Sequence, residues 1–160
     1  MSEYRVWSLP GIAAALLFLA AGSDEVGILP APERVAAESL QGPVSAVVSR
    51  VIDGDTIEVH AFVWIGQTLT IRVRIDGVDA PELEARCMEE RRLALAAREF
   101  LVRRLEGASV KLTQVVYDKY GGRVRADVAD AKGDIAGALL MSGFARAYHG
   151  ERRAPWCVAS

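Results

Sequence analysis

The sequence has few of the residues that build several common kinds of functional site. Its 160 residues include only two cysteines and two histidines, and the spacings of Cys87, Cys157, His60 and His149 do not match those of zinc sites. The 19 basic and 21 acidic residues give a formal net charge of −2, which differs from the basic profile of tight DNA-binding proteins. Aromatic residues make up 7% of the chain, so few side chains are available to stack on bases.

The chain also lacks an N-terminal apolar run long enough to span a membrane. The run from Leu9 to Ala21 has about 13 residues, whereas a spanning helix needs about 20. It follows Arg5 and ends in a cluster of small residues at Gly22, which is the order of a secretory signal peptide. We predict that residues 1–22 are a cleaved signal, with an uncleaved anchor as the alternative. The mature protein is then periplasmic or secreted and has no stable membrane span.

The two cysteines are predicted to pair if the protein is exported, because oxidising compartments favour disulfides. A Cys87–Cys157 bridge would close a loop of about 70 residues and stabilise the fold by about 4 kcal/mol on the chain-entropy model. Two free buried thiols are the alternative.

Hydrophobic residues make up 51% of the chain, a proportion typical of a globular protein. Segment 23–43 contains Pro30, Pro32 and Pro43 and has no sustained periodicity, so we predict a flexible linker. The folded domain is expected to span residues 44–160.

The folded segment has the pattern of a small, mainly β domain of the α+β class. Asp53-Gly54 indicates a two-residue hairpin turn of type I′. Asp134 is the expected N-cap of a short helix, and Arg74 lies on the polar face of a strand whose apolar residues alternate with arginines. Five antiparallel strands with two or three helices fit the OB-fold, a partly open Greek-key barrel. The strands are expected at 44–51, 56–62, 69–76, 110–116 and 124–128, and the helices at 81–106 and 135–142.

Four charged clusters fall at the expected ends of these strands. Three of these segments have a purely structural explanation: a hairpin turn at Asp53-Gly54, a helix N-cap at Asp79, and a hairpin loop at 118–122. Together, however, they place carboxylates that suit a hard divalent cation beside arginines that suit a phosphate. The combination predicts a metal-dependent phosphodiesterase site. The clusters are Asp53-Gly54-Asp55, Arg74, Asp79-Ala80-Pro81-Glu82 and Arg123.

These motifs resemble those of the staphylococcal nuclease (thermonuclease) family from about Val44 to Tyr148. The run from Val51 to Thr56 is similar to the first motif of the family, and the run from Asp118 to Arg123 is similar to the third. Arg74, followed five residues later by Asp79-Ala80-Pro81-Glu82, is similar to the second motif.

The resemblance implies a role for each motif residue. Asp55, Asp79 and the backbone carbonyl of Ala80 would bind Ca²⁺, and a backbone ligand is unaffected by the threonine that the type member has in place of this alanine. Glu82 would act as the general base or orient the attacking water. Phosphate would be held by Arg74 and Arg123, and the nucleotide would be contacted by Lys119, Tyr120 and Tyr148.

One departure from the family pattern concerns the second phosphate ligand. Arg123 follows a Gly-Gly pair where the type member has one glycine, so Arg125 is an alternative.

The resemblance further implies a monomeric, Ca²⁺-dependent nuclease that cleaves DNA and RNA with low sequence specificity, prefers single strands and leaves 3′-phosphate ends. The main alternative is an OB-fold module that binds single-stranded nucleic acid without catalysis. A surface or assembly protein that uses the barrel as a scaffold is a third alternative.

Overall fold

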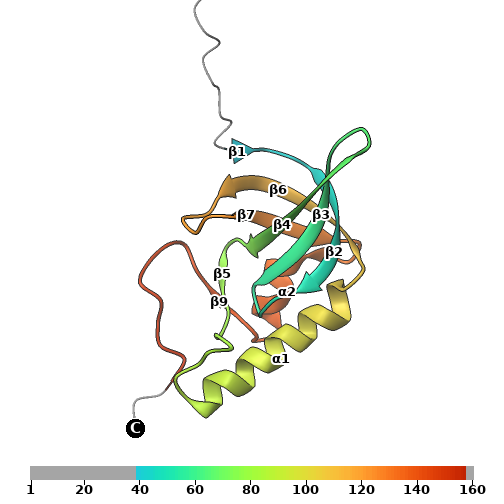
Figure 1. The fold of residues 1–160 in the computed structure, drawn as a ribbon. Helices are drawn as coiled ribbons and strands as arrows, with labels where there is room; N and C mark the ends of the chain where they lie inside the picture. Colours follow the sequence, from blue (N-terminus) through green and yellow to red (C-terminus); the bar gives the residue numbers. More distant parts are fainter. Residues whose placement is uncertain (1–38, 158–160) are drawn as a thin grey trace, which may run out of the picture. The chain divides into compact units, whose positions relative to one another are not determined.

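The computed structural model describes residues 39–157. The predicted signal or anchor, residues 1–22, lies outside the described residues. Five long strands form a closed barrel in the order β6-β2-β3-β4-β7, and β6 also pairs with β7 (Figure 1). This confirms the predicted OB-fold. The barrel strands are β2 (Val44–Val51), β3 (Thr56–Trp64), β4 (Gln67–Ile75), β6 (Ser109–Tyr117) and β7 (Arg123–Asp130).

The remaining elements are short strands and two helices. Helix α1 (Met88–Leu105) connects the β2–β3–β4 meander to β6, and α2 (Ile135–Met141) follows β7. The short strands are β1 (Ser39–Leu40), β5 (Val78–Asp79), β8 (Gly133–Asp134) and β9 (Arg146–Ala147). No helix within residues 39–157 combines the length and hydropathy needed to cross a membrane.

One strand pair of the barrel is parallel, which corrects the expectation of an all-antiparallel sheet. After β4 the chain passes through α1 to β6, and β7 then runs antiparallel to β6. This path places β7 beside β4 with both strands in the same direction. Their register places Arg74 opposite Arg125 and Arg72 opposite Arg123. The parallel pair therefore brings arginines that are distant in sequence onto neighbouring strands.

Alternation along the strands sends apolar side chains into the barrel. Helix α1 contributes Ala97, Leu101 and Leu105, which are buried at 0% exposure, and α2 contributes Ile135 and Leu139. The short helix begins where it was predicted to begin, because the Asp134 side chain accepts a hydrogen bond from the Gly137 amide. The fully buried strand residues include Val48, Val51, Ile57, Val59, Val73, Ile75 and Leu112.

Two local predictions were wrong. Helix α1 begins at Met88 rather than near Pro81, because residues 80–87 follow the short strand β5 in an irregular path. Asp79 is consequently a strand residue, so the alternative explanation of this residue as a helix N-cap does not apply. Strand β1 lies inside segment 23–43, which was predicted to be a linker, and pairs with β6, so Ser39 and Leu40 belong to the sheet. The rest of that prediction, residues 23–38, lies outside the described residues.

The turn between β2 and β3 is also not of type I′, since neither Asp53 nor Gly54 has a positive φ. The glycine is needed for a different reason. A Cβ atom at Gly54 would lie 2.8 Å from the Cβ of Ala80 and 2.9 Å from the Cβ of Ala97. Gly54 thus lets this turn pack directly against both the acidic segment and α1.

Candidate active site

The structure brings together three of the predicted site residues in the interior of the protein. Arg74 Nη1 lies 2.8 Å from Asp55 Oδ2, and Arg74 Nη2 lies 4.0 Å from Asp79 Oδ1. The exposed fractions of Asp55, Arg74 and Asp79 are 4%, 6% and 4%. Two buried carboxylates therefore share a single nearby buried arginine, and this set is called the acidic site below.

Hydrogen bonds from or to neighbouring residues fix the positions of Asp55 and Arg74 in the acidic site. The Ala80 amide donates to Asp55 Oδ2 at 3.3 Å, and the Thr56 hydroxyl donates to Asp55 Oδ1 at 2.9 Å. Arg74 Nη2 donates to the Val78 carbonyl at 3.1 Å. The predicted ligand segment, Asp79-Ala80, is thus hydrogen-bonded directly to Asp55.

Asp55 and Asp79 place two buried carboxylates beside one buried guanidinium, that of Arg74. Burial raises the pKa of Asp55 to about 6, Arg74 opposes this shift, and Asp53 adds to it. Asp79 Oδ1 is buried and accepts no hydrogen bond from any described residue. The nearest positive charge to this oxygen is the partly exposed Arg153, whose Nε lies 3.0 Å away without donating a hydrogen bond to it. A buried carboxylate oxygen of this kind favours a nearby cation.

The acidic site therefore fits a hard divalent cation. Ca²⁺ takes oxygen ligands in a flexible shell, and Asp55, Asp79 and the Ala80 carbonyl are the residues that would provide them. In the described part of the chain, the one group of three ligand-type side chains within 4.8 Å of one another is Cys87, Glu90 and Cys157. This group does not suit Ca²⁺, since its two sulfur atoms are joined in a disulfide.

Glu82 lies at the solvent-exposed edge of the acidic site. Its side chain is 53% exposed, and Oε1 lies 2.5 Å from Arg153 Nη1. The Glu82 amide is 3.5 Å from Glu90 Oε1, which holds the segment before α1 against the helix. Glu82 is thus accessible to water, as a general base requires, but it is engaged by an arginine.

A hollow of about 500 Å³ next to the acidic site contains the predicted phosphate and nucleotide ligands. Arg123 donates to Asp118 with its Nε at 2.7 Å, and Arg125 Nη1 donates to Asp76 at 2.8 Å. Both arginines line the hollow and each is paired with an aspartate, so the structure does not decide between them as the phosphate ligand. The other lining residues are Arg74, Tyr117, Asp118, Lys119, Tyr120, Tyr148, His149, Gly150 and Arg153.

The hollow combines cations with aromatic rings. The Arg123 guanidinium lies 5.0 Å and Lys119 Nζ lies 5.2 Å from the centre of the Tyr120 ring. Tyr117 and Tyr120 are 76% and 57% exposed. This surface offers positive charge to a phosphate and ring faces to a base.

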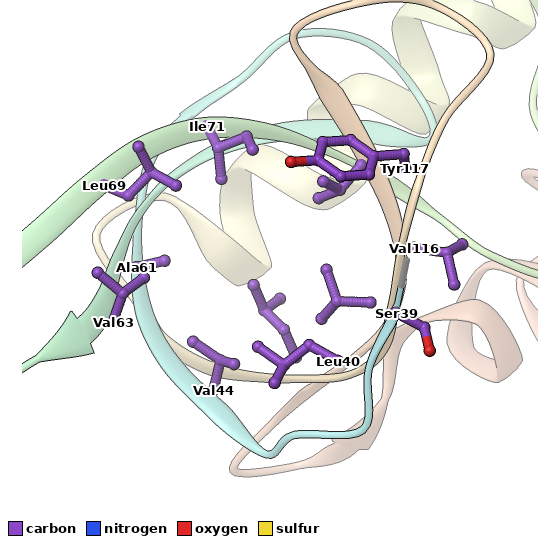
Figure 2. A pocket seen from close by; sticks show the side chains of 12 residues that line it. Ser39, Leu40, Val44, Ala61, Val63, Leu69, Ile71, Val116 and Tyr117 are labelled. Atoms are coloured by element: carbon purple, nitrogen blue, oxygen red, sulfur yellow. The ribbon is translucent and has the colours of Figure 1, made fainter. Parts of the chain in front are cut away.

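A second hollow, of about 210 Å³, lies at the mouth of the barrel and is lined mainly by aliphatic side chains (Figure 2). Leu40, Val44, Leu69 and Ile71 are among its lining residues, and Tyr117 lines both hollows. Because it contains no charged side chain, this apolar hollow cannot hold a phosphate or activate water.

Sequence reasoning missed two residues of the acidic site, Arg153 and Trp156. Arg153 Nε lies 3.0 Å from Asp79 Oδ1, and Trp156 Nε1 donates to Asp79 Oδ2 at 3.3 Å. Both follow the family motifs in sequence, in a segment without periodicity. The available signal was Cys157, which is bonded to Cys87 and thereby ties this segment to the start of α1.

The fold and the site together define an OB-fold domain with a buried acidic site beside an arginine-lined hollow. The family model described as staphylococcal nuclease homologue matches residues 72–155, which is more than half of the chain, and the protein belongs to this family. No curated protein matches the sequence. Membership of this family supports a nuclease-type function and nucleic-acid binding for the domain. Asp55 lies outside the matched range and joins the site through its contacts with Arg74 and Ala80.

Proposed function

We propose that this protein is an exported, Ca²⁺-dependent nuclease that hydrolyses phosphodiester bonds of DNA and RNA with low sequence specificity. The observation that carries the proposal is the convergence of Asp55, Arg74 and Asp79 in one buried site, with Asp79 Oδ1 lacking a hydrogen bond. The arginine-lined hollow beside it supports a phosphate substrate.

In the proposed reaction, Arg74 and Arg123 hold the scissile phosphate and stabilise the negative charge that develops on it. Glu82 accepts a proton from the attacking water, whose oxygen bonds to phosphorus while the bond to the 5′ oxygen breaks. The leaving 5′ oxygen keeps the electron pair of the broken bond and takes a proton from solvent, so the products are a 3′-phosphate and a 5′-hydroxyl. Bound Ca²⁺ would supply a Lewis acid beside Asp55 and Asp79.

The hollow suggests why a single strand is the better substrate. Lys119, Tyr120 and Tyr148 line it together with the arginines, so a nucleotide that enters can place its phosphate on cations and its base on a ring. A base held in a duplex must first unstack to make the same contact, at a cost of a few kcal/mol. We therefore propose that single-stranded and frayed substrates are cleaved faster than duplexes.

The test is cleavage of single-stranded DNA and RNA by the purified protein in Ca²⁺ and in EGTA, beside a Glu82→Ala variant. Cleavage that requires Ca²⁺ and falls at least a hundredfold in the variant supports the proposal. Products should resist polymerase extension until a phosphatase removes the 3′-phosphate. If the folded wild type binds single strands but does not cut them at any pH, the protein is a non-catalytic binding module.

A further inference from the structure

The segment from Gly150 to Cys157 lies against the acidic site. Arg153 uses Nε and Nη1 to contact two different carboxylates, those of Asp79 at 3.0 Å and Glu82 at 2.5 Å. Trp156 donates to the other oxygen of Asp79. Asp79 is thereby contacted on both oxygens by one short segment of the chain.

Several independent contacts hold this segment in place. The Cys87–Cys157 disulfide ties its end to the residue before α1. Arg146 Nη1 donates to the Pro155 carbonyl at 3.1 Å, and the Arg146 guanidinium stacks on the Trp156 ring at 3.7 Å. The position of Arg153 therefore results from a fixed local structure rather than from a chance surface ion pair.

We propose that Arg153 is a built-in counter-ion that competes with the divalent cation for Asp79 and Glu82. The proposal rests on the proposed function, because the competing cation is Ca²⁺. A Ca²⁺ ion would lie 2.3–2.6 Å from its carboxylate oxygens. Because Arg153 Nε is already 3.0 Å from Asp79 Oδ1, an ion on that oxygen would be within a few ångströms of a second positive charge. The ion and the guanidinium cannot both keep these contacts.

The contact between Arg153 and Asp79 is weak enough for a cation to replace the guanidinium. Although Arg153 Nε is close to Asp79 Oδ1, its N–H does not make a hydrogen bond to that oxygen. The Arg153 side chain is also 39% exposed, so it can turn toward solvent while the disulfide keeps its backbone nearby. Arg153 lines the phosphate hollow as well, so the displaced guanidinium remains beside the position of the substrate.

The disulfide sets the strength of this competition. Tethering keeps the guanidinium at a high effective concentration next to Asp79, and opening the loop lowers that concentration. Reduction of Cys87–Cys157 should therefore change the affinity for Ca²⁺ in the same direction as removal of the Arg153 charge.

The experiment measures Ca²⁺ binding to the full chain by isothermal titration calorimetry, without nucleic acid. Arg153→Met should bind Ca²⁺ about tenfold more tightly than wild type, because a like charge at the edge of the site is gone. Arg153→Lys, which keeps the charge, should stay within about threefold of wild type. The control is Arg152→Met at the exposed neighbouring position, and its affinity should be unchanged.

A second readout separates competition from a merely structural role. In EGTA, Arg153→Met should melt at a lower temperature than wild type, because the acidic site has lost its counter-ion. Saturating Ca²⁺ should raise its melting temperature by more than it raises that of wild type. Arg153→Gln serves for the same measurements if the methionine variant does not fold.

Unchanged or weaker Ca²⁺ binding by a folded Arg153→Met protein would overturn the inference. If that protein still cleaves DNA in Ca²⁺, the proposed nuclease stands and the competition alone fails. A wild-type protein that neither binds Ca²⁺ nor cleaves nucleic acid would overturn both.

Discussion

Arg74 Nη1 lies 2.8 Å from Asp55 Oδ2, and both side chains are more than nine-tenths buried. The two residues face each other because β3 and β4 pair with Thr56 opposite Arg74, which puts Asp55 at the strand end beside the arginine. The pair links the first charged motif of the sequence to the second. It is therefore the contact on which the geometry of the acidic site depends most directly.

We predict that Arg74→Met lowers the free energy of unfolding by about 3–5 kcal/mol, the usual effect of leaving a buried charge without its partner. Urea unfolding in EGTA measures the change. Arg72→Met is the matched control, since Arg72 is an exposed residue on the same strand, and its effect should stay within about 0.5 kcal/mol. Similar effects of the two substitutions would contradict the assigned role of Arg74.

We predict that Gly54→Ala destabilises the protein by about 1–3 kcal/mol, the usual effect of overpacking. The added methyl group would meet Ala80 and Ala97 at less than 3.0 Å. Weaker Ca²⁺ binding should accompany the loss, because Ala80 is a proposed ligand. Gly121→Ala is the control, since a Cβ atom there has no neighbour within 4 Å among the described residues. Thermal unfolding measures the effect, and equal melting temperatures for both variants and the wild type would contradict the prediction.

We predict that Arg123→Ala reduces cleavage by about 10²–10³-fold, as expected for loss of a group that stabilises the transition state. Both arginines form an ion pair, Arg123 with Asp118 and Arg125 with Asp76. Arg123 differs in also lying 5.0 Å from the centre of the Tyr120 ring. Arg125→Ala should accordingly keep most of the activity. Measuring kcat/KM for both variants decides the assignment, and the reverse pattern would move the phosphate contact to Arg125.

We predict a pH-dependent contribution to stability from Arg104 and Asp130, which join α1 to β7 through two hydrogen bonds of 2.8 and 2.9 Å. The Arg104 hydrogen bond lowers the pKa of Asp130 below its usual value of 3.8. Stability from this pair is therefore fully present above about pH 4 and is lost as pH falls through the lowered pKa.

Asp130→Asn should thus cost about 1.5–3 kcal/mol at pH 7, and the difference from wild type should shrink below pH 4. Urea unfolding across this pH range provides the measurement. Glu89→Gln is the control, because Glu89 and Arg92 form a largely exposed ion pair that contributes little. A difference that stays constant down to pH 2 would mean that packing, and not charge, explains the effect of Asp130.

We predict that the double variant Cys87→Ser with Cys157→Ser loses about 4 kcal/mol of stability, as the chain-entropy model gives for a closed loop of this length. The two cysteines are 70 residues apart. Urea unfolding of the variant and of reduced wild type should give similar midpoints. If the reduced protein is as stable as the oxidised one, the bridge orders the last residues without stabilising the barrel.

The barrel and its site were predictable from sequence to the extent that local patterns encode them. The alternation of apolar and polar residues, together with the turn residues, was sufficient to locate all five barrel strands. Asp134 and the residues after it were sufficient to predict the start of α2. The turn at Gly54 was located correctly but explained incorrectly. A glycine is required there because the side chains of Ala80 and Ala97 pack against the turn in the folded protein. These residues are distant in sequence, so local sequence patterns do not reveal the contact.

Arg153 shows a second kind of limit. The family motifs end before it, and its own neighbourhood has neither helical nor strand periodicity. Its place beside Asp79 follows from the disulfide and from the stacking of Arg146 on Trp156. Such contacts depend on the path of an irregular segment through space, which composition and spacing do not specify.

The parallel pairing of β4 with β7 also has a consequence for biosynthesis. Arg74 and Arg125 become neighbours only when β7 docks beside β4, after the intervening helix and β6 have been made. A ribosome-bound chain that has released only the part from β2 to β5 carries Asp55 and Asp79 but lacks the arginines of β7. If the proposed nuclease activity requires Arg123, nucleic acids near a ribosome would therefore meet an inactive chain, and the proposed hydrolysis would begin only after β7 has docked.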